Sequence, residues 1–473
     1  MTSKSTRMFD DEEEEGFEGN LKEDLEKFEA FLKGESLGFL DSDRLEALID
    51  HFLINSQYAK AKACAEHAIS QFSYNPIFHL RKAQAISAVG QLKEALKIIN
   101  HIEKWEPPSC ELLLTKASIF SQLRDRKNAV RYFEQALALA EPEDRDEIYL
   151  DLAMEYAHSG DFKKAVVILK EAISNNPHNE GAIYEIAFCY DQLGEYEQAI
   201  KCYSDFIDEN PYSFTAWYNL GNACSKLEDY EKAIWAYDYC LIINEEFGPA
   251  HFNLGSVYLS IEKYEEAIVS LERCMELDGE DAMALSYLGE ACEQLNQLDK
   301  ARNCYNRSIE LAPGLPDAWL GMGIVEDLQG NTEVALTFLH KAAELDPGNA
   351  GVFHVLAGAY EKLNNFDSAE EYYRLSLELD PTDEECLIDF VSLLADSALL
   401  EAYQYIDEFC VQDEQNVVAR VLKVNILWLM GRKNESLLLF ATCVEADKDK
   451  AREIFTINPD LSNVQEFVTL TEE

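Results

Sequence analysis

Residues 213–240 read SFTAWYNLGNACSKLEDYEKAIWAYDYC, and this stretch holds two apolar patterns separated by a short polar break. Trp217, Gly221 and Cys224 recur at spacings of three and four residues, which places them on one face of a helix. After the break KLEDY, a second helical face begins at Ala233. The stretch therefore predicts a pair of helices joined by a tight turn.

The same pair of patterns recurs along the chain with a period of 34 residues. The first small residue of the second pattern marks the series: Ala61, Ala95, Ala129, Ala165, Ala199, Ala233, Ala267, Ala301, Ala335, Ala369, Ala402 and Ser436. One step is 36 residues and one is 33. The twelve units begin near residues 42, 76, 110, 146, 180, 214, 248, 282, 316, 350, 384 and 417. A single hairpin leaves one apolar side bare, so we expect successive units to stack.

Glycine and proline stand where the helices must end or approach each other. Five units have glycine at the break, where a left-handed residue closes the first helix: Gly90, Gly160, Gly194, Gly330 and Gly431. Proline opens or closes six units, at Pro107, Pro177, Pro211, Pro313, Pro347 and Pro381. Four further glycines lie on first helices where we expect the second helix to pack closely: Gly221, Gly255, Gly289 and Gly323.

The pattern W..LG..C/Y, then A...Y..C/A and a boundary proline, resembles the tetratricopeptide repeat family. The resemblance covers residues 42 to about 450 and points to multi-repeat bacterial proteins of that family. It implies an all-α fold, a right-handed α-solenoid of about twelve helix hairpins whose inner groove is lined by first helices. The end units match less well, since the first lacks a large aromatic residue in its first helix and Ser436 replaces the alanine.

We expect four parts along the chain. Residues 1–19 are an acidic disordered leader, 20–41 an N-terminal capping helix, 42–450 the twelve units, and 451–473 a C-terminal capping helix. An apolar stripe supports the first cap, at Leu21, Leu25, Phe28 and Leu32. A partner-binding helix is the other interpretation of this segment.

The charge of the chain restricts its partners. It has 89 acidic and 40 basic residues and a formal net charge of −49. Such a surface repels phosphate backbones and anionic lipids and attracts basic segments. We therefore expect no direct binding to nucleic acid or membranes, and a protein or peptide partner with basic character. The other interpretation is that the acidic residues serve solubility on exposed helix faces.

No feature of the sequence indicates catalysis. The twelve cysteines are dispersed without CxxC pairs or Cys/His clusters at zinc-ligand spacing. No nucleotide-binding or hydrolase motif is present, and neither a secretory leader nor a membrane-length apolar run is found. We expect a cytoplasmic, non-enzymatic protein with no metal and no cofactor.

Positions on first helices that packing does not use define a candidate peptide-binding groove. Its residues are Tyr184, Phe188, Tyr218, Asn222, Phe252, Ser256, Glu290, Glu293, Asp327 and Glu361, with His354 near the acidic end. Exposed rings can anchor a peptide because they bury a large area with little loss of rotamer entropy. Alternatively, the rings pack against neighbouring helices and the acidic residues form a solvated face.

These features favour a scaffold or adaptor that binds a peptide segment or partner protein. Two alternatives are an acidic assembly factor or chaperone that shields a basic client, and a regulatory subunit of a separate enzyme. A complex dominated by charge should weaken steeply with salt, whereas one dominated by apolar anchors should not.

Overall fold

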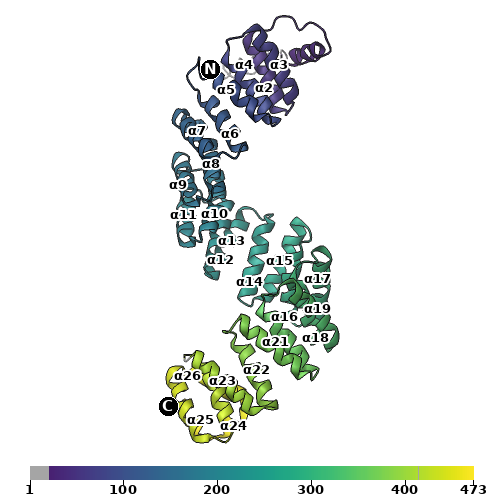
Figure 1. Ribbon diagram of the computed structural model, residues 1–473, viewed down its shortest axis with the longest axis vertical. Helices are drawn as coiled ribbons and strands as arrows, with labels where there is room; N and C mark the ends of the chain where they lie inside the picture. Colours follow the sequence, from purple (N-terminus) through teal and green to yellow (C-terminus); the bar gives the residue numbers. More distant parts are fainter. Residues whose placement is uncertain (1–20, 414, 473) are drawn as a thin grey trace, which may run out of the picture. The chain divides into compact units, whose positions relative to one another are not determined.

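The computed structural model describes residues 21–413 and 415–472, and in this part of the chain helices α2 to α28 follow one another without a strand (Figure 1). Helices α2 to α25 pair into twelve consecutive hairpins. This confirms the all-α repeat fold. The chain divides into two compact units, the first ending at Ile243 and the second beginning at Asn244. None of the described helices has the length and apolar character to cross a membrane.

Each of these two compact units contains six hairpins, and each hairpin is one of the twelve repeats. The first helices of the first unit are α2 (Ser42–Ile54), α4 (Pro76–Ala88), α6 (Cys110–Gln122), α8 (Arg145–His158), α10 (Glu180–Leu193) and α12 (Phe214–Lys226). Its second helices are α3 (Tyr58–Gln71), α5 (Leu92–Ile102), α7 (Arg126–Leu139), α9 (Phe162–Asn175), α11 (Tyr196–Glu209) and α13 (Tyr230–Ile243). A 3-10 turn, η1 (Pro142–Asp144), precedes α8 and accommodates the one long step in the repeat.

The second unit repeats this order. Its first helices are α14 (Gly248–Ser260), α16 (Ala282–Gln294), α18 (Pro316–Leu328), α20 (Ala350–Lys362), α22 (Glu384–Ser397) and α24 (Val417–Leu429). Its second helices are α15 (Tyr264–Asp278), α17 (Leu298–Leu311), α19 (Thr332–Leu345), α21 (Phe366–Leu379), α23 (Leu399–Gln412) and α25 (Lys433–Ala446). Within each unit, a helix packs mainly on the helices one or two places away in sequence.

The hairpin turns require a left-handed residue. The five break glycines have φ between 64° and 83°, as expected. Six other hairpins have a residue with a side chain and positive φ at the same place: Ser56, Arg124, Glu228, Glu262, Asn296 and Asn364. The turn geometry is thus common to these hairpins, whether or not glycine is present.

Close approach of the two helices explains the glycines on first helices. A Cβ atom at Gly221 would lie 2.5 Å from the ring of Tyr237, and one at Gly289 would lie 2.7 Å from the ring of Tyr305. Carbon atoms in contact prefer separations of about 3.5–4.0 Å. These positions therefore accept no side chain unless the opposing ring moves.

The N-terminal segment packs on the first hairpin. Residues 21–32 are helical, and Phe28 is completely buried with its ring centroid 5.5 Å from that of Phe52. Asp24 is also buried and forms an ion pair with Arg44 of α2. The expected disordered leader, residues 1–19, lies outside the described residues.

The C-terminal segment differs from the single helix expected over 451–473. It consists of α26 (Lys448–Arg452), α27 (Ile454–Ile457), the 3-10 turn η2 (Pro459–Asn463) and α28 (Gln465–Glu472). Pro459 has no amide hydrogen to donate, so a continuous helix cannot pass through it without losing a bond. Phe467 of α28 still packs on the last hairpin, 4.8 Å from the ring of Phe440.

Candidate functional site

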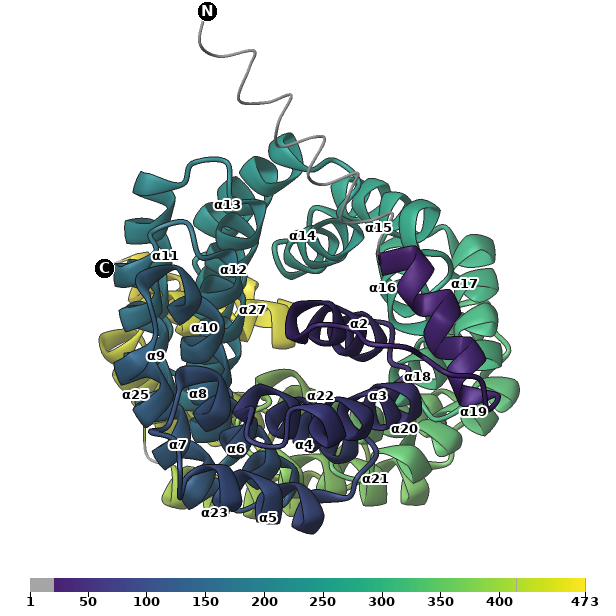
Figure 2. The same ribbon diagram turned by 90° about the horizontal axis from the view of Figure 1, so that it is seen from above.

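Two predicted rings are prominently exposed on α10 of the first unit. Tyr184 is 67% exposed and Phe188 is 54% exposed. Figure 2 shows α8 and α10 next to each other, with α9 and α11 to their left. A cleft of about 240 Å³ lies beside Phe188, and its walls come from α8, α9 and α10. Large apolar side chains left in water beside a hollow are typical of binding surfaces.

Met154 of α8 belongs to the same cleft and was not predicted. It is 43% exposed and lies 34 residues before Phe188, at the equivalent position of the preceding repeat. Extending the register of the predicted groove by one repeat toward the N-terminus would have identified it. The apolar cleft is lined by Ala153, Met154, Ala157, His158, Phe162, Leu169, Glu185, Phe188 and Cys189.

Tyr218 and Asn222 of α12 are only half-buried. The ring of Tyr218 lies 6.1 Å from that of Tyr237, the buried tyrosine of the paired helix α13. The hydroxyl of Tyr237 donates a hydrogen bond of 2.7 Å to Oδ1 of Asn222. Asn222 therefore already satisfies a buried hydroxyl of its own hairpin.

The same arrangement recurs in the second unit with carboxylates as acceptors. Tyr305 donates to Glu293 at 3.0 Å, and Tyr373 donates to Glu361 at 2.9 Å. Both tyrosines are at most 3% exposed. These predicted site residues thus have a structural role in the hairpin, and their role in ligand binding stays a prediction.

Enclosure changes the acidity of Glu293. Burial, together with the nearby Glu290, raises the pKa of Glu293 to about 7, although the Tyr305 hydroxyl partly opposes the shift. An unfolded chain has the ordinary value of 4.5. The folded chain therefore binds more protons between these two values, and the contribution of Glu293 to stability falls as the pH rises through that window.

The free energy of unfolding of the unchanged chain should fall between pH 5 and pH 8 as Glu293 ionises. We expect Glu293→Gln to remove about 1–3 kcal/mol of this fall. Glutamine preserves the hydrogen-bond acceptor for Tyr305 and cannot ionise. Denaturant unfolding at the two pH values measures this difference. Glu265→Gln, at an exposed acid of α15, is the matched control, and an equal pH effect in both variants would contradict the assignment.

The remaining predicted residues of the second unit also have neighbours. Phe252 stacks on Tyr287, with ring centroids 5.6 Å apart, and Ser256 is half-buried. Asp327 forms an ion pair of 2.5 Å with Lys362 of the next first helix. Glu290 is exposed. The second unit therefore presents less available apolar and acidic surface at these positions than the sequence alone indicates.

An acidic cleft in the first unit was missed by the sequence analysis. It has a volume of about 750 Å³ and lies between α4, α6 and α8. Its acidic lining residues are Glu111, Glu143, Asp144, Asp146, Glu147 and Asp151. Reduced hydration in the cleft, with Glu147 and Glu155 nearby, raises the pKa of Asp151. In the described part of the chain no lysine or arginine is ion-paired with Glu147 or Asp151.

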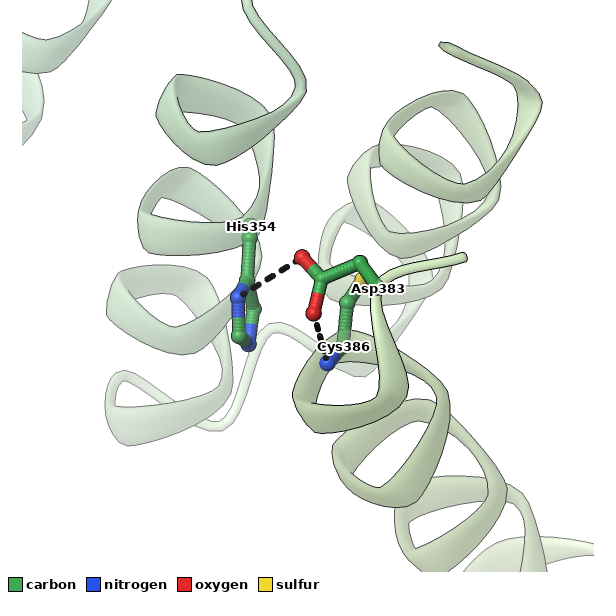
Figure 3. A group of neighbouring side chains, drawn as sticks. All are labelled: His354, Asp383 and Cys386. Carbon is green, nitrogen blue, oxygen red and sulfur yellow. Dashed lines mark hydrogen bonds and ion pairs between the residues drawn. The ribbon is translucent and has the colours of Figure 1, made fainter. Parts of the chain in front are cut away.

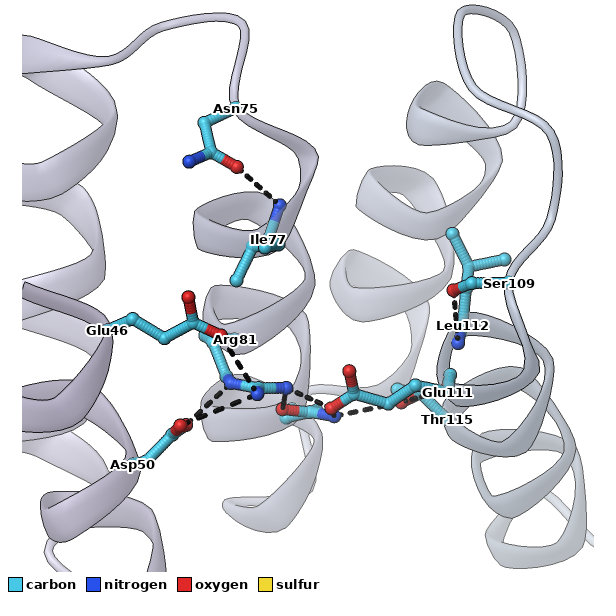
Figure 4. Close-up of polar contacts among 10 residues, drawn as sticks. Glu46, Asp50, Asn75, Ile77, Arg81, Ser109, Glu111, Leu112 and Thr115 are labelled. Carbon is cyan, nitrogen blue, oxygen red and sulfur yellow. Dashed lines mark hydrogen bonds and ion pairs between the residues drawn. The ribbon is translucent and has the colours of Figure 1, made fainter. Parts of the chain in front are cut away.

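Arg81 of α4 contacts Glu111, one of the acidic residues of this cleft, and is already ion-paired. Its guanidinium contacts Glu46 and Asp50 of α2 and Glu111 of α6 (Figure 4). Gln84 donates to Glu111 at 3.1 Å. Arg81 thus joins three consecutive first helices, and among the described residues it forms no ion pair with an acid of α8.

Comparison with known families agrees with this architecture. Models described as tetratricopeptide repeat match residues 190–242, 248–314, 294–350 and 328–387. The chain folds as a solenoid of tetratricopeptide repeats. A model described as anaphase-promoting complex, cyclosome, subunit 3 matches residues 122–206, the region that contains the apolar cleft. None of these families is described as an enzyme.

Individual proteins are similar over parts of the repeat array. Anaphase-promoting complex subunit 3 of Schizosaccharomyces pombe is 25% identical over 163 residues, which are 34% of this chain and 23% of that protein. The chain thus covers less than a quarter of that relative's length, and similarity to tetratricopeptide repeat proteins is not specifically bacterial.

Two solved structures are examples of structural similarity over parts of the chain. The Cut9–Hcn1 hetero-tetramer has a TM-score of 0.44 at 14% identity, covering 82% of this chain and 90% of that chain. YrrB, described as having an unusual peptide-binding site, has a TM-score of 0.32 at 25% identity, covering 39% of this chain and 95% of that chain.

Proposed function

We propose that this chain is a non-enzymatic scaffold that binds a peptide segment of a partner protein on the first helices of its first unit. The observation that carries the proposal is the apolar cleft between α8 and α10, which is lined by the exposed Met154 and Phe188, with the exposed Tyr184 one helical turn before Phe188 on α10. Rigid rings on packed helices bury area at low entropic cost, which makes them effective anchors.

Charge supports a basic character for the bound segment. Helix α8 contributes to both clefts, because Glu147 and Asp151 line the acidic one while Met154 lines the apolar one. These three residues are spaced by four and three positions and so share one helix face. Within the described residues, no lysine or arginine lines either cleft. A segment with an apolar side chain next to lysine or arginine would complement this face.

The predicted residues of the second unit have a smaller part in this proposal. Phe252, Ser256 and Glu290 could extend a binding surface there, whereas Asp327 is neutralised by Lys362. We therefore assign the main anchor to Tyr184 and Phe188.

Phe188→Ala is expected to weaken peptide binding at least about fivefold, since a central aromatic anchor contributes more than about 1 kcal/mol. The peptides would be selected from a random phage-displayed library on the unchanged protein and measured by fluorescence anisotropy. Val167→Ala is a matched control, because Val167 of α9 is also 54% exposed but lies outside the apolar cleft. Equal affinity of both variants would refute the anchor, and a library that yields no binding peptide would refute the proposal.

The dependence of the binding affinity on salt distinguishes this function from that of an acidic chaperone for basic clients. An anchored peptide should keep most of its affinity between low and physiological ionic strength, whereas a complex held by charge alone should lose it. The same anisotropy measurement at two salt concentrations makes the distinction.

A second candidate is a subunit of a larger protein assembly. It is favoured by the match of residues 122–206 to the anaphase-promoting complex subunit 3 model, which includes α8 and α10. The partner would then be another subunit rather than a transient ligand. Affinity purification of the tagged chain, followed by native mass spectrometry, would reveal a fixed stoichiometry in that case.

A further inference from the structure

Three potential metal ligands from adjacent repeats converge in the second unit (Figure 3). His354 lies on α20, Asp383 is the N-cap residue of α22, and Cys386 lies in the first turn of α22. One ligand atom of each residue lies within 4.8 Å of the others. Sequence spacing did not suggest this cluster, because His354 and Cys386 are separated by nearly one full repeat.

Asp383 is held in place by the helix that it caps. One carboxylate oxygen, Oδ1, accepts a 3.0 Å hydrogen bond from the amide of Cys386. The other oxygen, Oδ2, lies 3.7 Å from Nδ1 of His354. That separation is too long for a hydrogen bond but is close to the edge of a tetrahedron with metal–ligand bonds of about 2.1 Å, which is about 3.4 Å.

His354 is oriented by a second carboxylate on its far side. Its Nε2 lies 2.9 Å from Oδ2 of Asp389, also on α22. A proton on Nε2 that is donated to Asp389 leaves the lone pair on Nδ1, the nitrogen that faces Asp383. Histidines that bind metals usually donate their other ring N–H to a carboxylate in this way.

Cys386 supplies the third donor. Its side chain is fully buried, and its thiol makes a weak contact of 3.9 Å with the carbonyl oxygen of Tyr373. Zn²⁺ is bound by thiolate, imidazole and carboxylate together, whereas Ca²⁺ and Mg²⁺ prefer oxygen alone.

We propose that His354, Asp383 and Cys386 form a binding site for a divalent transition metal ion of the Zn²⁺ type. Nδ1 of His354, Oδ2 of Asp383 and Sγ of Cys386 are the three protein ligands, and water completes the tetrahedron. On binding, the S–H bond of Cys386 breaks, its proton goes to solvent, and the sulfur electron pair forms the bond to the metal. The ion would join α20 to α22 and thereby two consecutive repeats.

Cobalt(II) is the probe that tests the site, because its bond to a thiolate gives a strong charge-transfer absorption in the near ultraviolet. The full-length, metal-free protein is expected to bind one Co²⁺ with this absorption, and Zn²⁺ should displace it. Cys386→Ser should abolish the absorption. Cys443→Ser is the matched control, because Cys443 is equally buried in α25 but outside the cluster, and it should leave the absorption unchanged.

Two further variants keep the test independent of folding defects at the buried cysteine. His354→Gln, at a partly exposed position, should prevent stoichiometric binding while the circular dichroism stays unchanged. Asp389→Asn should weaken Co²⁺ binding about 10–100-fold without loss of the thiolate absorption. Absence of stoichiometric binding, or absorption that persists in Cys386→Ser, would overturn the proposal and leave a protonated His354 between two carboxylates as the role of the cluster.

Discussion

Trp217→Ala is expected to lower the free energy of unfolding by about 3–5 kcal/mol, because it leaves a large cavity in a packed hairpin. Trp217 is 7% exposed. Its ring stacks on that of Tyr239, with the ring centroids 4.7 Å apart, and lies edge-on to that of Trp235, with the centroids 5.0 Å apart. Its indole N–H donates to the carbonyl oxygen of Pro211 at 2.9 Å. Denaturant unfolding monitored by circular dichroism measures the loss.

The neighbouring Tyr218→Ala is the comparison for this variant. The ring of Tyr218 is half-buried and packs near Tyr237, so we expect a loss of about 1 kcal/mol, larger than for a fully exposed side chain. If both variants destabilised the protein equally, the division of α12 into a packing face and a binding face would be wrong.

Gly321→Val is expected to destabilise the second unit by about 3 kcal/mol through overpacking. A Cβ atom at Gly321 would lie 2.1 Å from the Cζ atom of Tyr305. The ring cannot move away easily, since Gly289 of α16 also lies against it and its hydroxyl is bonded to Glu293. Thermal unfolding of the variant measures the effect.

Gly358→Val provides the matched substitution in the neighbouring first helix α20. No atom lies within 4 Å of a Cβ built at Gly358, so this variant should change stability by less than about 0.5 kcal/mol. A comparable loss in both variants would contradict the role of the contact with Tyr305, since helix propensity favours valine over glycine at both positions.

The repeat fold could be predicted because each hairpin repeats the same pattern of apolar, small and turn residues. The positive φ of Gly194 and the contact between Gly221 and Tyr237 follow from spacing alone. The exposure of Tyr184 and Phe188 also agrees with their positions off the packing face.

Which polar side chains already have partners within the chain could not be predicted in the same way. Periodicity assigns Asn222 and Glu293 to a helix face, but it does not show that a buried tyrosine reaches across the hairpin to them. Likewise, the meeting of His354 with Cys386 depends on how α20 and α22 stack. Such contacts, within a hairpin and between repeats, depend on side-chain reach and helix angle, which a single sequence pattern does not specify.

The restriction of packing to near neighbours in sequence has a consequence for how the chain acquires its structure. Because few contacts within either unit close long loops, little chain entropy is lost before the first native contacts form. Folding of a unit can then nucleate at any hairpin and spread to the adjacent ones, and a hairpin at an end can open while the others stay intact.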